Sequence, residues 1–197
     1  LFLIFPTLEG GGIAYPIMLS VFGETGLART VLFDVGSALM LFTVVYVIAA
    51  GGNDWLRKLS RQPILYVIAL GIILNVFNLT PSLFTSILDT IFAALVLVIM
   101  FMLGIDFRLN LSHFGKGAIV TVAKTSLGLG FGLLVIQLFG FTGIDRMAVL
   151  VMCALPPSII TFAYAKENRM DTEFLANVFS FSIPFSLIVI TALIYFA

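Results

Sequence analysis

Apolar stretches of about 20 residues recur along this chain, and they limit its fold more than any other feature of the sequence. A helix of that length spans the hydrocarbon core of a bilayer, which is about 30 Å thick. Of the 197 residues, 61% are apolar and only 10% are charged, whereas soluble domains carry about 25% charged residues. No soluble core would bury so much apolar surface. The sequence therefore predicts an all-α membrane protein.

Turn-forming residues divide these stretches into seven predicted spans joined by short connections. The spans cover residues 2–20, 27–50, 63–79, 83–104, 115–139, 144–165 and 172–196. No soluble domain fits between them, so the prediction is a multi-span helical bundle. The chain opens on Leu rather than Met, and we expect it to be a fragment that lacks the beginning of a longer protein.

The charged residues predict how the bundle is oriented and exclude one class of partner. The formal net charge is zero, which gives no reason to expect nucleic acid. Alternate loops hold Arg57, Lys58, Arg61, Arg108, Lys116, Lys166 and Arg169 on one side, and Arg29 and Arg146 on the other. Cytoplasmic loops carry the excess of basic residues. We therefore expect loops 51–62, 105–114 and 166–171 in the cytoplasm of a multi-pass plasma membrane protein.

Two of the predicted spans contain residues that interrupt helices. The first span holds Gly10, Gly11 and Gly12 followed by Pro16, and the sixth holds Pro156 and Pro157. Consecutive glycines lower helix propensity, and prolines remove backbone donors, so both spans should unwind near the middle of the membrane. Unwound backbone at that depth is tolerated only where it lines a cavity or is buried in protein.

The two interrupted spans are five spans apart, so they run in opposite directions across the membrane. This arrangement is typical of inverted repeats, in which two broken crossover helices meet near the midplane and form a substrate site. We expect inverted five-helix repeats, with residues 1–50 ending the first repeat and residues 51–197 forming the second. Within the second, a scaffold hairpin covers about 63–104 and core helices cover about 115–196.

Four stretches occur in an order that resembles one family of transporters. They are residues 10–16 with 22–24, residues 62–81, residues 95–104 closing on Leu-Gly-Ile-Asp, and residues 155–158 with 163–166 and Asp171. This set resembles the last seven of ten helices in the auxin efflux carrier family, within a superfamily that includes bile acid:sodium symporters. The resemblance implies a scaffold domain, a mobile core domain holding both crossovers, and a homodimer formed through scaffold helices.

The resemblance also implies a class of substrate. Plant members carry an asparagine close to the proline of the first crossover, whereas here Gly12-Ile13-Ala14-Tyr15 leads into Pro16. Auxin itself is therefore not the expected substrate, and small organic anions such as malate or malonate are. We expect a secondary active transporter that works by alternating access, with no cofactor and with H⁺ or Na⁺ as the coupling ion.

Ionisable groups deep in a bilayer are costly unless they are paired or face a cavity, so they are candidates for function. Lys124 would be a countercharge for an anionic substrate or for Glu9, and Glu9 would carry a proton. Asp34 and Asp89 have structural or helix-end roles in this interpretation. The predicted substrate-binding residues lie at the crossovers or near the midplane: Glu9, Gly10, Gly11, Gly12, Pro16, Lys124, Pro156, Pro157, Ser158 and Asn177.

Alternatives remain open for the residues and for the function. In the alternative without a transport role, Glu9 and Lys124 form a structural ion pair, or Lys124 extends to the cytoplasmic edge. In the same alternative, the crossovers are packing kinks that touch no ligand, and Asn177 only bonds neighbouring helices. A passive channel or a non-transporting receptor would share the broken helices. An intramembrane aspartyl enzyme is disfavoured because Asp34 and Asp89 lie near the outer boundary of their spans, with no Gly-x-Gly-Asp pattern and no Ser-His pair within the spans. We predict no enzyme.

Overall fold

The computed structural model describes residues 4–50, 57, 60–79, 82–106, 114–167, 170 and 172–196. Within these ranges the regular structure is helical and contains no β-strand. The elements in chain order are η1 (Gly10–Ala14), α1 (Tyr15–Met40), η2 (Leu41–Val45), α2 (Tyr46–Ala50), α4 (Pro63–Val76), α5 (Ser82–Asp106), α6 (Phe114–Phe139), α7 (Gly143–Ala154), α8 (Ile159–Glu167) and α9 (Thr172–Tyr195). The prediction of an all-helical membrane protein is confirmed.

The segment that begins with η1 and α1 contains two helices, not one. Gly23 interrupts α1 with φ of 65° and ψ of −160°, a conformation that residues with a Cβ rarely adopt. The Tyr15 hydroxyl donates a hydrogen bond of 2.7 Å to Asp34 Oδ2. A straight helix would separate residues 15 and 34 by about 28 Å, so the chain must reverse at Gly23. This reversal separates the predicted spans 2–20 and 27–50.

Four helical segments of the described chain are long and apolar enough to cross a membrane. They cover Gly10–Ile48, Gly115–Phe139, Gly143–Lys166 and Thr172–Tyr195. The first contains the reversal at Gly23, and the third contains the break between α7 and α8. Helix α4 has 14 residues and is about 21 Å long, which is shorter than the hydrocarbon core. The predicted span 63–79 is therefore realised as a short helix.

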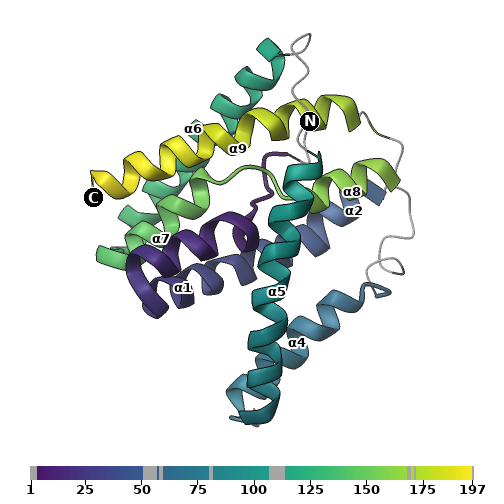
Figure 1. Ribbon diagram of the computed structural model, residues 1–197, viewed down its shortest axis with the longest axis vertical. Helices are drawn as coiled ribbons and strands as arrows, with labels where there is room; N and C mark the ends of the chain where they lie inside the picture. The colour runs from purple at the N-terminus through teal and green to yellow at the C-terminus, as the bar shows by residue number, and fades with distance from the viewer. Residues whose placement is uncertain are drawn as a thin grey trace.

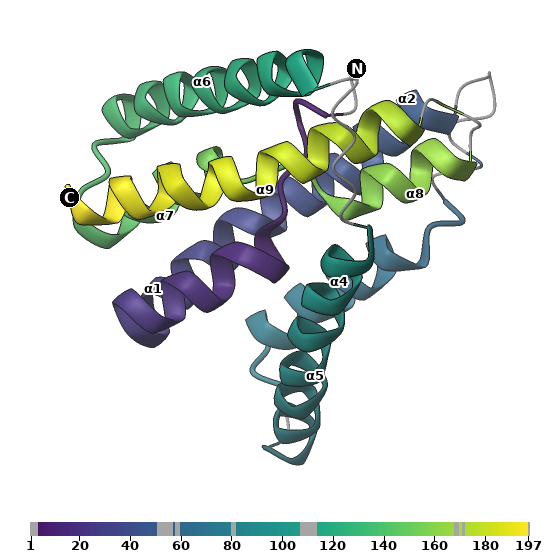
Figure 2. The same cartoon turned by 45° about the horizontal axis from the view of Figure 1, so that its top comes forward.

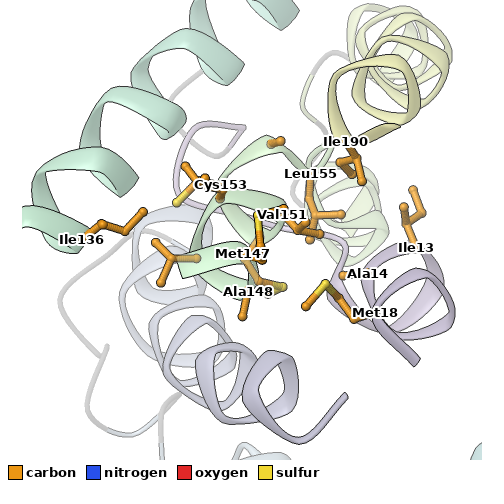
Figure 3. Packing of buried hydrophobic residues seen from close by; sticks show 14 residues of the cluster. Ile13, Ala14, Met18, Ile136, Met147, Ala148, Val151, Cys153, Leu155 and Ile190 are labelled. Carbon is orange, nitrogen blue, oxygen red and sulfur yellow. The ribbon is translucent and has the colours of Figure 1, made fainter. Parts of the chain in front are cut away.

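Helix α7 forms the centre of a bundle with α1, α6 and α9 packed around it (Figure 1). Every residue from Met147 to Leu155 is buried. In Figure 3, Ile136 of α6, Met18 of α1 and Ile190 of α9 surround the side chains of α7. Residues of η1 and α1 thus share this core with α6, α7 and α9, and Leu41 and Val45 of η2 pack against Tyr164 of α8 in a second cluster. The division into units 1–50 and 51–197 stays a prediction.

Helices α4 and α5 form an arm that projects from this bundle (Figures 1 and 2). The arm meets the bundle where α5 approaches η1, and the rings of Tyr15 and Phe92 lie 5.8 Å apart there. Most of the large apolar side chains described on α4 are exposed. The arm occupies the predicted scaffold hairpin, about 63–104. Most residues of the three predicted cytoplasmic loops lie outside the described part of the chain, so their orientation stays a prediction.

Candidate functional site

The second crossover is an extended segment between α7 and α8. Helix α7 ends at Ala154, and Leu155 takes φ of −65° and ψ of 153°. Residues before proline avoid the helical region, and the two prolines that follow lack the N–H that a helix requires. Leu155, Pro156, Pro157 and Ser158 are all buried. The prediction that this span breaks at Pro156 and Pro157 is confirmed.

The first crossover lies slightly earlier than the sequence predicts. Thr7, Leu8 and Glu9 are the non-helical residues, whereas Gly10, Gly11 and Gly12 belong to the π-helical turn η1. The prediction that the glycines themselves unwind is therefore wrong. The reason at Gly10 is close approach, since a Cβ there would lie 2.6 to 2.8 Å from the carboxyl atoms of Asp34.

Pro16 sits in the first turn of α1, directly after η1. The missing N–H of Pro16 removes one backbone donor at the point where η1 passes into α1. The Tyr15 N–H bonds the Gly10 carbonyl and links the π-helical turn to α1. Pro16 therefore follows the unwound segment rather than breaking the helix. Residues 2 and 3 of the predicted first span lie outside the described residues.

The two crossovers contact each other through backbone and side-chain hydrogen bonds. The Glu9 N–H donates to the Pro156 carbonyl over 3.1 Å. Thr7 Oγ1 accepts from the Ser158 N–H over 3.4 Å and from the Thr161 hydroxyl over 3.0 Å. Segments 150 residues apart in the chain thus form one polar junction inside the bundle, as the interpretation of the two breaks predicts.

The Glu9 carboxylate caps the beginning of α8. Its Oε2 accepts a hydrogen bond of 2.9 Å from the N–H of Ile159, which is the first residue of that helix. The Ser158 hydroxyl accepts from the Ile160 N–H over 3.4 Å. The first amides of a helix have no intrahelical acceptor, and the helix dipole favours a negative charge there. Glu9, with 5% of its surface exposed, supplies that charge from the other crossover.

The Lys124 ammonium lies at the opposite end of the break. Lys124 is 3% exposed, and its Nζ donates a hydrogen bond of 2.8 Å to the carbonyl of Leu155, just beyond the end of α7. It does not extend to the cytoplasmic edge. Lys124 and Glu9 do not form an ion pair. The ion pair found among the described residues joins Arg29 and Asp145 at the surface. Lys124 and Glu9 occupy the two ends of one broken helix.

Asn177 lies on α9 and is buried where α9 faces α6. It does not belong to either crossover. Its Nδ2 donates to the Glu173 carbonyl of its own helix over 3.2 Å. A Cβ on Gly117 of α6 would lie 3.5 Å from the Asn177 carbonyl oxygen. Nearby on the same interface, the hydroxyls of Thr121 and Ser182 lie 2.7 Å apart. The contacts at Gly117 and Thr121 join α6 to α9, and a role for Asn177 in substrate binding stays a prediction.

Sequence reasoning missed three residues at the junction. Thr7 and Thr161 escaped notice because isolated threonines are common in membrane helices and carry no charge. Asp34 was given a structural or helix-end role, without a place at the first crossover. Its carboxylate lies against Gly10 and accepts the hydrogen bond from Tyr15. Its position within an apolar span was the signal that would have found it. Asp89, the other aspartate considered, lies exposed on α5.

Comparison with known proteins assigns the family. A family model described as membrane transport protein matches residues 52–195, which is more than half of the chain. The chain belongs to the membrane transport protein family. The resemblance to auxin efflux carrier-like transporters is thus confirmed, and the chain is a multi-pass membrane protein that lies in a lipid bilayer.

Two curated relatives extend the comparison. One is an uncharacterized transporter of Methanocaldococcus jannaschii, 28% identical over 191 residues that cover 91% of this chain and 62% of the relative. The other is an uncharacterized transporter of Methanothermobacter thermautotrophicus, 26% identical over 92% of this chain and 62% of the relative. The chain therefore spans less than two thirds of either relative's length. No solved structure matches it.

Proposed function

We propose that the complete protein is a secondary active transporter that moves small organic anions, such as dicarboxylates, by alternating access. The observation that carries this proposal is the polar junction of the two crossovers, with Glu9 and Lys124 both buried within it. Broken helices that meet inside a bundle form the substrate sites of many transporters. Family membership supports the proposal, because the matching family is one of membrane transport proteins.

Lys124 favours an anion as the substrate. The described residues place no carboxylate within ion-pair distance of its ammonium, and its printed hydrogen bond goes to a neutral carbonyl. A charge buried in a bilayer protein is costly unless it is compensated. A bound carboxylate would supply this compensation, and the remaining donors of the ammonium are suited to binding it.

Glu9 supplies a group that would couple transport to a gradient. In the present conformation its carboxylate holds the N-terminus of α8, and protonation would weaken that contact. Proton binding at Glu9 would thus loosen one crossover from the other, which alternating access requires. The coupling ion, the plasma membrane location and a homodimer formed through the α4–α5 arm are parts of this proposal.

Uptake into proteoliposomes tests the proposal directly. The complete native protein would be reconstituted, and the uptake of radiolabelled malate and malonate measured with and without a proton gradient. We expect saturable flux that the gradient drives and that Glu9→Gln abolishes. Glu24→Gln is the matched control, because Glu24 is exposed next to the reversal at Gly23, and its flux should equal that of the native protein.

Each other outcome has a clear meaning for the proposal. The absence of saturable flux for any carboxylate tested would overturn the anion substrate. Flux that runs down its gradient but never responds to an imposed gradient would favour a passive channel. Unchanged gradient-driven flux in Glu9→Gln would return Glu9 to a purely structural role at the beginning of α8.

A further inference from the structure

The carbonyl end of α7 is already occupied by a positive charge of the protein itself. The last carbonyls of a helix have no intrahelical donor and carry partial negative charge. In transporters with broken helices, such carbonyl ends and the unwound backbone beside them coordinate Na⁺ or H⁺. Here the Leu155 carbonyl, the first beyond α7, accepts a hydrogen bond of 2.8 Å from the Lys124 ammonium.

The packing of α6 holds Lys124 at this place. Lys124, Gly128 and Gly132 are spaced four residues apart, so they lie along one face of α6. A Cβ on Gly128 would lie 2.5 Å from the Cys153 carbonyl oxygen, and one on Gly132 would lie 2.9 Å from Cys153 Sγ. The two glycines therefore allow the backbone of α6 to approach the end of α7. Lys124, one turn earlier, is thereby brought to Leu155.

The break between α7 and α8 is compensated at both ends by the protein's own charges. Glu9 supplies a negative charge at the amide end of α8, and Lys124 supplies a positive charge at the carbonyl end of α7. When both groups are ionised, their charges are opposite, and each lies at the helix end whose dipole favours it. A sodium ion added at the carbonyl end would have to displace the ammonium or tolerate its repulsion.

We propose that Lys124 is a resident cation that takes the place of a coupling sodium ion, so that transport does not require Na⁺. The inference rests on the proposed transport function and narrows its coupling ion, since the sequence left H⁺ and Na⁺ equally open. In this role Lys124 holds the end of α7 across the break through one donor, and the other donors of the ammonium stay available to the carboxylate of the proposed substrate.

Two measurements on the complete native protein test this inference. The first compares malate and malonate uptake in sodium chloride with uptake in choline chloride at equal ionic strength, and we expect equal flux. The second compares thermal unfolding in detergent in the same two salts. We expect no difference for the native protein. For Lys124→Ser, which removes the ammonium and leaves a hydroxyl, Na⁺ should raise the unfolding temperature by roughly 5 °C.

A variant pair on the same helix separates the role of Lys124 from a general loss of charge. Lys124→Met should lose transport in both salts, whereas Lys116→Met, at the exposed beginning of α6, should keep native flux. Native flux or native unfolding that depends on Na⁺ would overturn the inference, as would Lys124→Ser that gains nothing from Na⁺. Absence of flux in both salts would defeat the transport proposal alone, since the unfolding measurements still decide the role of Lys124.

Discussion

Helices α7 and α4 are both strongly apolar, but they have different neighbours. Every residue from Met147 to Leu155 of the α7 segment is buried by other helices. On α4, Val67, Leu70, Ile72, Ile73 and Val76 are all at least about half exposed (Figure 1). Because lipid tails are as apolar as leucine, helix association in membranes depends on close packing rather than on hydrophobicity. Apolar composition alone therefore does not distinguish the centre of a bundle from its surface.

The difference lies in the small residues on the neighbouring helix. Gly128 and Gly132 of α6 face Cys153 at distances that a side chain would not permit. On α4, Gly71 has no heavy atom within 4 Å of the position of a Cβ. Among the glycines that the structure describes, those whose Cβ would meet backbone atoms lie in the bundle. Three pairs of substitutions would sharpen this comparison or break it.

The largest effect is expected for Met152→Ala. Met152 is fully buried in α7, and truncating a buried methionine costs about 2 to 5 kcal/mol in protein cores. We expect the loss of unfolding free energy in mixed micelles to lie near the lower end of that range. Lipid reduces the contribution of transfer from water, so that mainly the cost of the cavity remains. Ile72→Ala on α4 should change it by less than about 0.5 kcal/mol. Equal losses for both variants would contradict the comparison.

Gly128→Ala should have the next largest effect. The added Cβ would lie 2.5 Å from the Cys153 carbonyl oxygen, so α6 would have to move away from α7. Overpacking of this kind costs about 1 to 3 kcal/mol. Gly71→Ala should instead stabilise α4 by about 0.5 to 1 kcal/mol, because alanine is the better helix former. Chemical unfolding of the two variants in micelles measures the expected opposite signs, and a stabilising Gly128→Ala would show that the contact is loose.

Tyr15→Phe should have the smallest effect of the three. It removes the hydrogen bond of 2.7 Å to Asp34 and leaves the part-buried carboxyl without that donor, which costs about 1 to 2 kcal/mol. Tyr66→Phe is the control, because the Tyr66 hydroxyl bonds the Ser60 carbonyl at an exposed site over 2.7 Å. Its unfolding temperature should match that of the native protein. A similar loss in both variants would mean that burial does not strengthen the bond to Asp34.

Much of the fold could be predicted from the sequence because it depends on local properties. The length of the apolar stretches specifies a membrane bundle, and Pro156 with Pro157 specifies the second break. The position of the first break was less predictable. Three glycines favour unwinding, but the chain unwinds just before them and uses Gly10 for its contact with Asp34. A glycine in a sequence indicates either an unwound backbone or a close approach by another part of the chain. The residues next to the glycine do not distinguish these two uses.

The sequence by itself determined that this protein lies in a lipid bilayer, which family it belongs to, that it is helical, and that two of its helical spans are interrupted. Only the tertiary structure decided which apolar helix lies at the centre and which charges meet the interruptions. Glu9 reaches Ile159 across 150 residues of chain, and Lys124 reaches Leu155 across 31. Such contacts depend on how closely whole helices approach one another, and that distance is set by packing around α7 rather than by any local pattern of residues.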